Sequence, residues 1–131
     1  MTSERRNYPR LHTRFPAEVL AGGKRAIDHA LATDVSITGL QLVCDERVAN
    51  RVVEKADKGK LKAAKPVLIH VNLPLRDGTH VRVEVRCKVR ALRKGEDGSF
   101  RVGLEYEFFE GQSYAALEAF IDDWVEFPAE S

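Results

Sequence analysis

The segment from His80 to Val89, HVRVEVRCKV, alternates strictly between polar or charged and apolar side chains. A period of two places successive side chains on opposite faces of a β-strand, so one face of this strand is apolar and the other is wet. Residues 67–75, VLIHVNLPL, carry a similar pattern, and Arg76-Asp77-Gly78-Thr79 joins the two segments. Because Asp-Gly tolerates the positive φ of a tight turn, the two segments predict a β-hairpin.

Weaker alternating patterns predict four further strands. These strands run over Phe15–Leu20, Ala26–Asp34, Leu40–Cys44 and Phe100–Phe108, with Gly22-Gly23 and Glu96-Asp97-Gly98 as additional turns. Six strands in antiparallel succession are enough to close a small barrel. We therefore expect a mainly β fold, built as a six-stranded antiparallel β-barrel.

A helix is expected near the C-terminus. After Ser113, a favourable N-cap residue, apolar side chains recur at helical spacing as far as Trp124, and Pro128 forbids continuation. We expect this amphipathic helix to cover an open edge or mouth of the barrel with its apolar stripe.

A second helical pattern lies between the third and fourth expected strands. In residues 46–60, Val48, Val52 and Ala56 are four positions apart, which is the spacing of one helix face. Gly59 and the surrounding lysines favour a short helical insertion that frays at the surface. We assign this segment no role in ligand binding. It could equally serve as a surface that binds a partner protein.

The chain is long enough for one hydrophobic core. It has 131 residues, of which 44% are hydrophobic, and this favours a single domain with short tails. We assign residues 1–14 to a flexible basic arm, 15–126 to the barrel with its helix, and 127–131 to a tail. Charged residues interrupt the apolar runs and the first ten residues lack an apolar core, so we expect a cytoplasmic protein without membrane insertion.

Catalytic chemistry finds no support in the sequence. The chain has four histidines, His12, His29, His70 and His80. None has metal-ligand spacing to a second His, Cys or carboxylate, and Ser36 lies in no nucleophile-elbow context. Cys44 and Cys87 lie in apolar alternating segments, where buried free thiols are expected rather than a redox pair. We therefore expect neither an enzyme nor a cofactor, and interpret His29 and His70 as ordinary strand residues.

Charge is unevenly distributed along the chain, although the formal net charge is only +1. Arginines make the first fourteen residues basic, residues 86–94 form a second basic stretch, and every ionised side chain from Glu105 to Glu130 is acidic. An acidic C-terminal segment does not attract polyanions, so we do not expect a nucleic acid polymer as partner. A small anion held by a local basic arm fits this distribution better.

The basic arm contains Arg6-Asn7-Tyr8-Pro9-Arg10, with Arg5 directly before it. Pro9 biases Tyr8 towards extended geometry, so the two arginines of this motif are not expected on one helix face. A guanidinium group forms bidentate hydrogen bonds with phosphate oxygens or with guanine O6 and N7, and it stacks on bases. Taken alone, arginines near a terminus favour a solvated basic tail.

A second motif, Asp34-Val35-Ser36-Ile37-Thr38-Gly39, lies between two expected strands. Strand alternation would place Asp34 and Ser36 on one side, where a carboxylate and a hydroxyl can meet the N–H donors of a purine edge. Gly39 would adopt a backbone conformation closed to other residues and let the next strand turn. Each residue alone is equally typical of an Asx or Ser turn.

The two motifs together resemble those of the PilZ domain, a bacterial receptor for the second messenger cyclic di-GMP. That family carries an RxxxR arm followed by (D/N)xSxxG, and this chain has both motifs in that order. FRVGLEY at 100–106 is similar to the family's closing strand, and the segment after Ser113 is similar to the helix that follows its barrel. The lysine-rich insertion between Cys44 and Pro66 departs from the resemblance, which otherwise covers nearly the whole chain.

The resemblance implies a barrel that binds cyclic di-GMP and has no active site. Arg6 and Arg10 would hold guanine and phosphate. Asp34 and Ser36 would bind the opposite base edge, with Gly39 shaping the turn. The resemblance implies no cofactor beyond the ligand itself.

The resemblance also bears on stoichiometry and signalling. Arginine directly before RxxxR tends to accompany a stacked pair of ligands in this family, so Arg5 predicts two cyclic di-GMP molecules per chain. An extra cation would offset the repulsion between the phosphates of two ligands. We expect binding to order the arm against the barrel and so to create a surface for a downstream protein partner.

Two other classes of protein remain as alternatives. A PilZ-like interaction module without nucleotide binding is disfavoured by the intact pair of motifs. A binder of RNA or single-stranded DNA is disfavoured because the strands lack clustered exposed aromatic residues for base stacking and the C-terminal segment is acidic.

Overall fold

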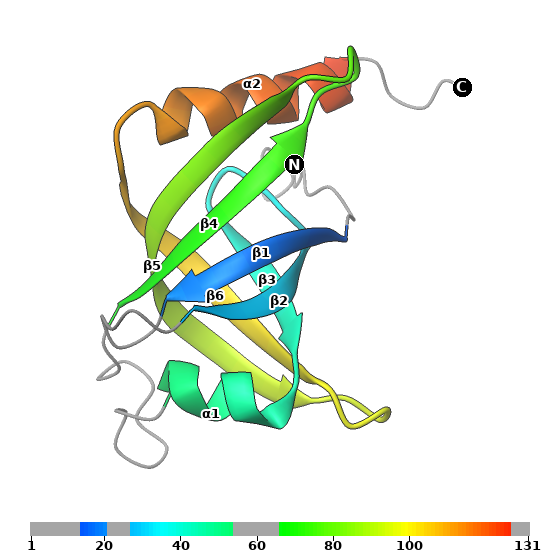
Figure 1. The fold of residues 1–131 in the computed structure, drawn as a ribbon, viewed down its shortest axis with the longest axis vertical. Helices are drawn as coiled ribbons and strands as arrows, with labels where there is room; N and C mark the ends of the chain where they lie inside the picture. Colours follow the sequence, from blue (N-terminus) through cyan, green and yellow to red (C-terminus); the bar gives the residue numbers. More distant parts are fainter. Residues whose placement is uncertain (1–13, 21–26, 54–65, 127–131) are drawn as a thin grey trace, which may run out of the picture.

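The computed structural model describes residues 14–20, 27–53 and 66–126. Within them the elements follow in the order β1 (Phe15–Leu20), β2 (Asp28–Thr33), β3 (Gly39–Cys44), α1 (Glu46–Val53), β4 (Val67–Pro74), β5 (His80–Lys94), β6 (Phe100–Phe109) and α2 (Ser113–Glu126). The strands form one closed barrel in the order β1-β2-β3-β6-β5-β4 (Figure 1). The predicted six-stranded barrel is therefore confirmed.

Every neighbouring pair of strands in the barrel is antiparallel. The β4–β5 and β5–β6 hairpins turn at Gly78 and Gly98, whose φ angles are 93° and 89°, as the Asp-Gly pairs predict. β5 extends to Lys94, beyond the expected end at Val89, because its pairing with β6 continues past an irregularity between Val89 and Ala91. The third predicted turn, Gly22-Gly23, lies outside the described residues.

The barrel interior is filled by the inward-facing side chains of the alternating strands. Every second residue is buried on β4, and on β5 from Val83 to Val89, as the period of two predicts. The largest fully buried side chains are Phe120, Leu42, Ile69, Leu73, Leu117, Val19, Val35, Val48, Val67, Val83, Val85 and Val89. A small barrel with a filled interior leaves a ligand only its outer surface and its rims.

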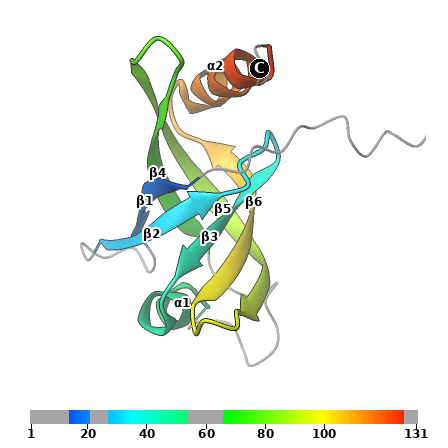
Figure 2. The same cartoon turned by 90° about the vertical axis from the view of Figure 1, so that its right-hand side faces the viewer.

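Helix α2 covers one mouth of the barrel, and α1 lies at the opposite end (Figures 1 and 2). α2 packs on β4 and β5, and it buries Leu117, Phe120 and Ile121. Its last turn is tied to the β4–β5 hairpin, because Trp124 Nε1 donates a 3.0 Å hydrogen bond to the Pro74 carbonyl oxygen. The closed barrel leaves no open edge, so the helix covers a mouth.

Helix α1 corrects the expectation of a fraying surface insertion for residues 46–53. Val48, Ala49 and Val52 are at most 4% exposed and belong to the core, which gives this short helix a tertiary anchor. Asp28 of β2 is buried and lies 3.0 Å from Arg51 Nε and 3.1 Å from an Arg47 terminal nitrogen. Residues 54–65 of the insertion lie outside the described part of the chain.

Both cysteines are buried free thiols, as expected. Burial raises the pKa of the Cys44 thiol to about 11 and that of Cys87 to about 12, because the thiolate loses solvation there. His29 and His70 lie on β2 and β4 as predicted. The described residues contain no cluster of side chains suited to a metal ion, and none of their helices is long and apolar enough to span a bilayer.

Candidate ligand-binding site on the outer face of the barrel

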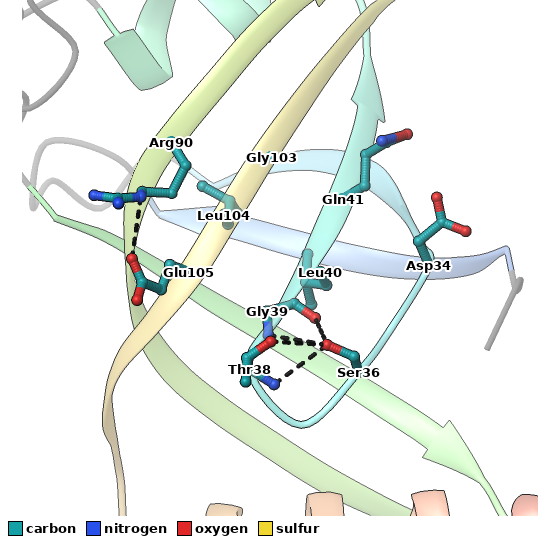
Figure 3. Close-up of a pocket in the computed structure, with 10 residues that line it drawn as sticks. All are labelled: Asp34, Ser36, Thr38, Gly39, Leu40, Gln41, Arg90, Gly103, Leu104 and Glu105. Atoms are coloured by element: carbon teal, nitrogen blue, oxygen red, sulfur yellow. Dashed lines mark hydrogen bonds and ion pairs between the residues drawn. The ribbon is translucent and has the colours of Figure 1, made fainter. Parts of the chain in front are cut away.

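An open pocket of about 370 Å³ lies where β3, β5 and β6 run side by side (Figure 3). It extends from the loop after β2 across β3 and β6 to β5. Its lining residues are Asp34, Ser36, Thr38, Gly39, Leu40, Gln41, Arg90, Gly103, Leu104 and Glu105. The pocket therefore contains all three predicted ligand residues of the second motif.

Two glycines form much of the pocket floor. Leu40 and Leu104 are buried in the core, so strand alternation turns the neighbouring Gly39 and Gly103 to the outer face. Gly39 pairs with Glu105, and Gln41 pairs with Gly103. Because glycine has no side chain, the backbone of the two paired strands is exposed there as a shallow surface.

Gly39 is required by close packing and not by its backbone angles. Its φ is not in the left-handed region, where the structure places Gly78, Gly98 and Gly111, so the predicted special conformation is wrong. A Cβ atom at position 39 would instead overlap the carbonyl oxygen of Leu104 on β6. The same addition at Gly103 would meet only Ala91 Cβ at 3.5 Å, an ordinary contact.

Ser36 organises the loop that enters the pocket. Its hydroxyl oxygen accepts hydrogen bonds from the backbone N–H groups of Thr38 at 3.2 Å and Gly39 at 3.3 Å. The hydroxyl also donates to the Gly39 carbonyl oxygen at 3.2 Å, and the side chain is almost fully buried. These bonds are those of a Ser-stabilised turn, and they fix the path of the loop into β3.

Asp34 occupies one side of the pocket, at the start of this loop (Figure 3). β2 ends at Thr33, so strand alternation does not relate Asp34 to Ser36 as predicted. The φ of Asp34 is 47°, a left-handed conformation that Asp tolerates better than most residues. The chain turns here, and the side chain is only partly buried.

Arg90 and Glu105 occupy the other side of the pocket and were not predicted as site residues. Arg90 Nε lies 3.1 Å from Glu105 Oε1 across the β5–β6 pair. Alternation along the expected strand Phe100–Phe108 puts Glu105 on the wet face, whereas Arg90 lies one residue beyond the expected end of the preceding strand. They line the same pocket as the Asp34 loop only because β3 pairs with β6, and no local sequence pattern indicates that pairing.

The remaining predicted site residues, Arg5, Arg6 and Arg10, lie outside the described residues. Their assignment to the site stays a prediction. β1 begins at Phe15, so only four residues separate Arg10 from the first strand of the barrel.

The comparisons with known proteins agree with this fold. The family model of the PilZ domain matches residues 4–123, so this chain belongs to the PilZ domain family. The match includes both motifs and every strand of the barrel. No curated protein sequence matches the chain.

Solved structures show the same architecture at low sequence identity. The Bacillus subtilis inhibitor of motility MotI/DgrA superposes with a TM-score of 0.64 and 17% identity, over 95% of this chain and 53% of that protein. K. pneumonia MrkH, solved as a complex with cyclic di-GMP, gives a TM-score of 0.61 and 12% identity, over 95% of this chain and 53% of MrkH. This chain thus spans about half the length of either protein, and the likeness shows the fold.

The two floor glycines should respond differently to an added methyl group. Gly39→Ala should lower the free energy of unfolding by about 1–3 kcal/mol, because the strand backbones must separate to admit the Cβ atom. Gly103→Ala should leave stability unchanged or slightly raised, because there is room for the methyl group and alanine has less entropy to lose on folding. Urea unfolding of both variants tests this, and a Gly39→Ala protein as stable as wild type would contradict the close approach.

Proposed function

We propose that this protein is a cyclic di-GMP receptor of the bacterial cytoplasm and not an enzyme. The observation that carries the proposal is the folding of the Asp34–Gly39 loop around an open pocket on the outer face of a PilZ barrel. MrkH, which shares this fold, is known in complex with cyclic di-GMP. The ligand is small, planar in its bases and doubly charged, which suits a shallow pocket with a backbone floor.

Asp34 is proposed to bind the donor edge of a guanine base. A carboxylate accepts hydrogen bonds only, and guanine presents adjacent N–H donors. The Ser36 hydroxyl is already engaged within the loop at 3.2 to 3.3 Å, which supports a positioning role for it beneath the base edge. Gly39 and Gly103 leave room for the flat face of the base.

The arm is proposed to supply the cations that the phosphates need. Among the described lining residues, Asp34 and Glu105 are acidic and Arg90 is basic, so this part of the pocket does not by itself favour an anion. Arg6 and Arg10 are proposed to bind guanine and phosphate from the other side. Binding would order residues 1–14 against the barrel and present a combined surface to a downstream protein.

A single substitution in either motif should weaken ligand binding strongly without unfolding the protein. Arg10→Ala and Asp34→Ala should each weaken cyclic di-GMP binding about ten- to a hundredfold, because each removes a hydrogen bond to a charged group worth about 1.5–3 kcal/mol. Calorimetric titration with cyclic di-GMP, GMP and a short RNA measures affinity and selectivity. Asp122→Ala, which removes an exposed carboxylate on α2, is the matched control.

Three outcomes of this titration would contradict the proposal. A wild-type protein that binds none of these compounds would favour an interaction module without nucleotide binding. Preferential binding of the RNA would favour the nucleic-acid alternative. Wild-type affinity in either variant would contradict the site assignment.

Arg5 should determine how many ligands bind. We propose two cyclic di-GMP molecules per chain at saturation, because a further guanidinium can offset phosphate repulsion and stack on an outer base. Arg5→Ala should reduce the stoichiometry towards one, with the loss mainly in the second ligand. Calorimetry at high protein concentration measures this, and a wild-type value of one, or two in both proteins, would contradict a role for Arg5.

A further inference from the structure

Arg90 is the one cationic side chain among the described residues that line the pocket. Its guanidinium is directed towards Glu105 and not across the floor towards Asp34 (Figure 3). Neither residue belongs to the RxxxR motif or to the (D/N)xSxxG motif. Both residues nevertheless line the pocket in which a doubly charged ligand would bind.

The Arg90–Glu105 pair is one of three similar ion pairs on the outer face of β5 and β6. The other two are Arg86–Glu110, at 3.2 Å, and Lys88–Glu107, at 3.3 Å. Arg90–Glu105 and Lys88–Glu107 join β5 to β6, and Arg86 of β5 pairs with Glu110, the residue directly after β6. All three pairs have partly exposed side chains. Only Arg90–Glu105 lines the pocket among these three, so the other pairs provide internal controls.

Breaking the Arg90–Glu105 ion pair should cost the protein little stability. The side chains are 56% and 51% exposed, so the guanidinium can move without opening the core. Exposed ion pairs contribute little to stability because water screens both charges. A phosphate offers a guanidinium two parallel charged hydrogen bonds, whereas Glu105 contacts Arg90 Nε through one carboxylate oxygen, Oε1.

We propose that Arg90 is a phosphate-binding residue of this site and exchanges Glu105 for a ligand phosphate when cyclic di-GMP binds. Glu105 then weakens binding, because it holds Arg90 in the free protein and repels the phosphates. The inference rests on the proposed function and adds a residue pair that neither motif contains. Substitutions at this pair, outside the two motifs, would then change the affinity for the ligand.

The test is a calorimetric titration of cyclic di-GMP into four proteins: wild type, Arg90→Gln, Glu105→Gln and the double variant. Arg90→Gln should bind about tenfold more weakly, and Glu105→Gln a few fold more tightly. In the Glu105→Gln background, loss of Arg90 should cost more affinity than in wild type. Without the Glu105 carboxylate, Arg90 binds the phosphate without first giving up another partner. Removing Arg90 from that variant therefore costs the whole of its interaction with the phosphate.

Arg86→Gln and Glu110→Gln are the matched controls, since they break an ion pair of similar length and exposure that lies outside the pocket. Both should bind within about twofold of wild type. If Arg90→Gln resembles Arg86→Gln, Arg90 acts only through general charge and the inference is wrong. Additive effects of Arg90→Gln and Glu105→Gln would likewise rule out the exchange.

These failures differ from a failure of the proposed function. If wild type does not bind cyclic di-GMP, both the proposed function and this inference are wrong. If wild type binds and Asp34→Ala does not, but Arg90→Gln binds like wild type, only the inference is overturned. Unchanged urea midpoints of the exposed-site variants exclude unfolding as the cause of any loss.

Discussion

The antiparallel pairing of β3 with β6 joins two strands that are distant in the sequence, and it does so at very close range. At Gly39 the backbones approach so closely that a Cβ atom would overlap the Leu104 carbonyl oxygen. This pairing closes the barrel and aligns Gly103 and Glu105 with the loop that carries Asp34. Since the core fills the interior, the candidate pocket is a surface feature that exists only because these two strands pair.

The elements of the fold were largely predictable from local patterns. Alternation and the Asp-Gly turns identified the strands, and the spacing after Ser113 identified α2. Helix α1 was underestimated because its pattern continues into a lysine-rich segment. Val48 and Val52 are nevertheless buried at the end of the barrel, and Asp28 lies beside the helix arginines. Such anchoring is a tertiary contact, which local helix propensity does not report.

The site was predictable only in part, because a motif identifies residue types and not their mutual placement. The Asp34 motif does line a pocket, and the structure gives two of its residues contacts that the motif alone does not specify. Ser36 holds the turn together, and Gly39 is constrained by packing against β6. Arg90 could not be assigned, since its position opposite the loop depends on the register of strands that are not consecutive. The assignment of the arm arginines to the site still rests on the resemblance alone.

The most direct measurement is amide hydrogen exchange of the full chain with and without cyclic di-GMP. If the ligand is bound between the arm and the outer face of the barrel, exchange should slow in residues 5–10 and 34–41 and stay unchanged in α1, at the far end. This pattern would also report the proposed ordering of the arm. Protection centred on α1, or saturating ligand that leaves residues 34–41 unaffected, would contradict a site built on the Asp34 loop.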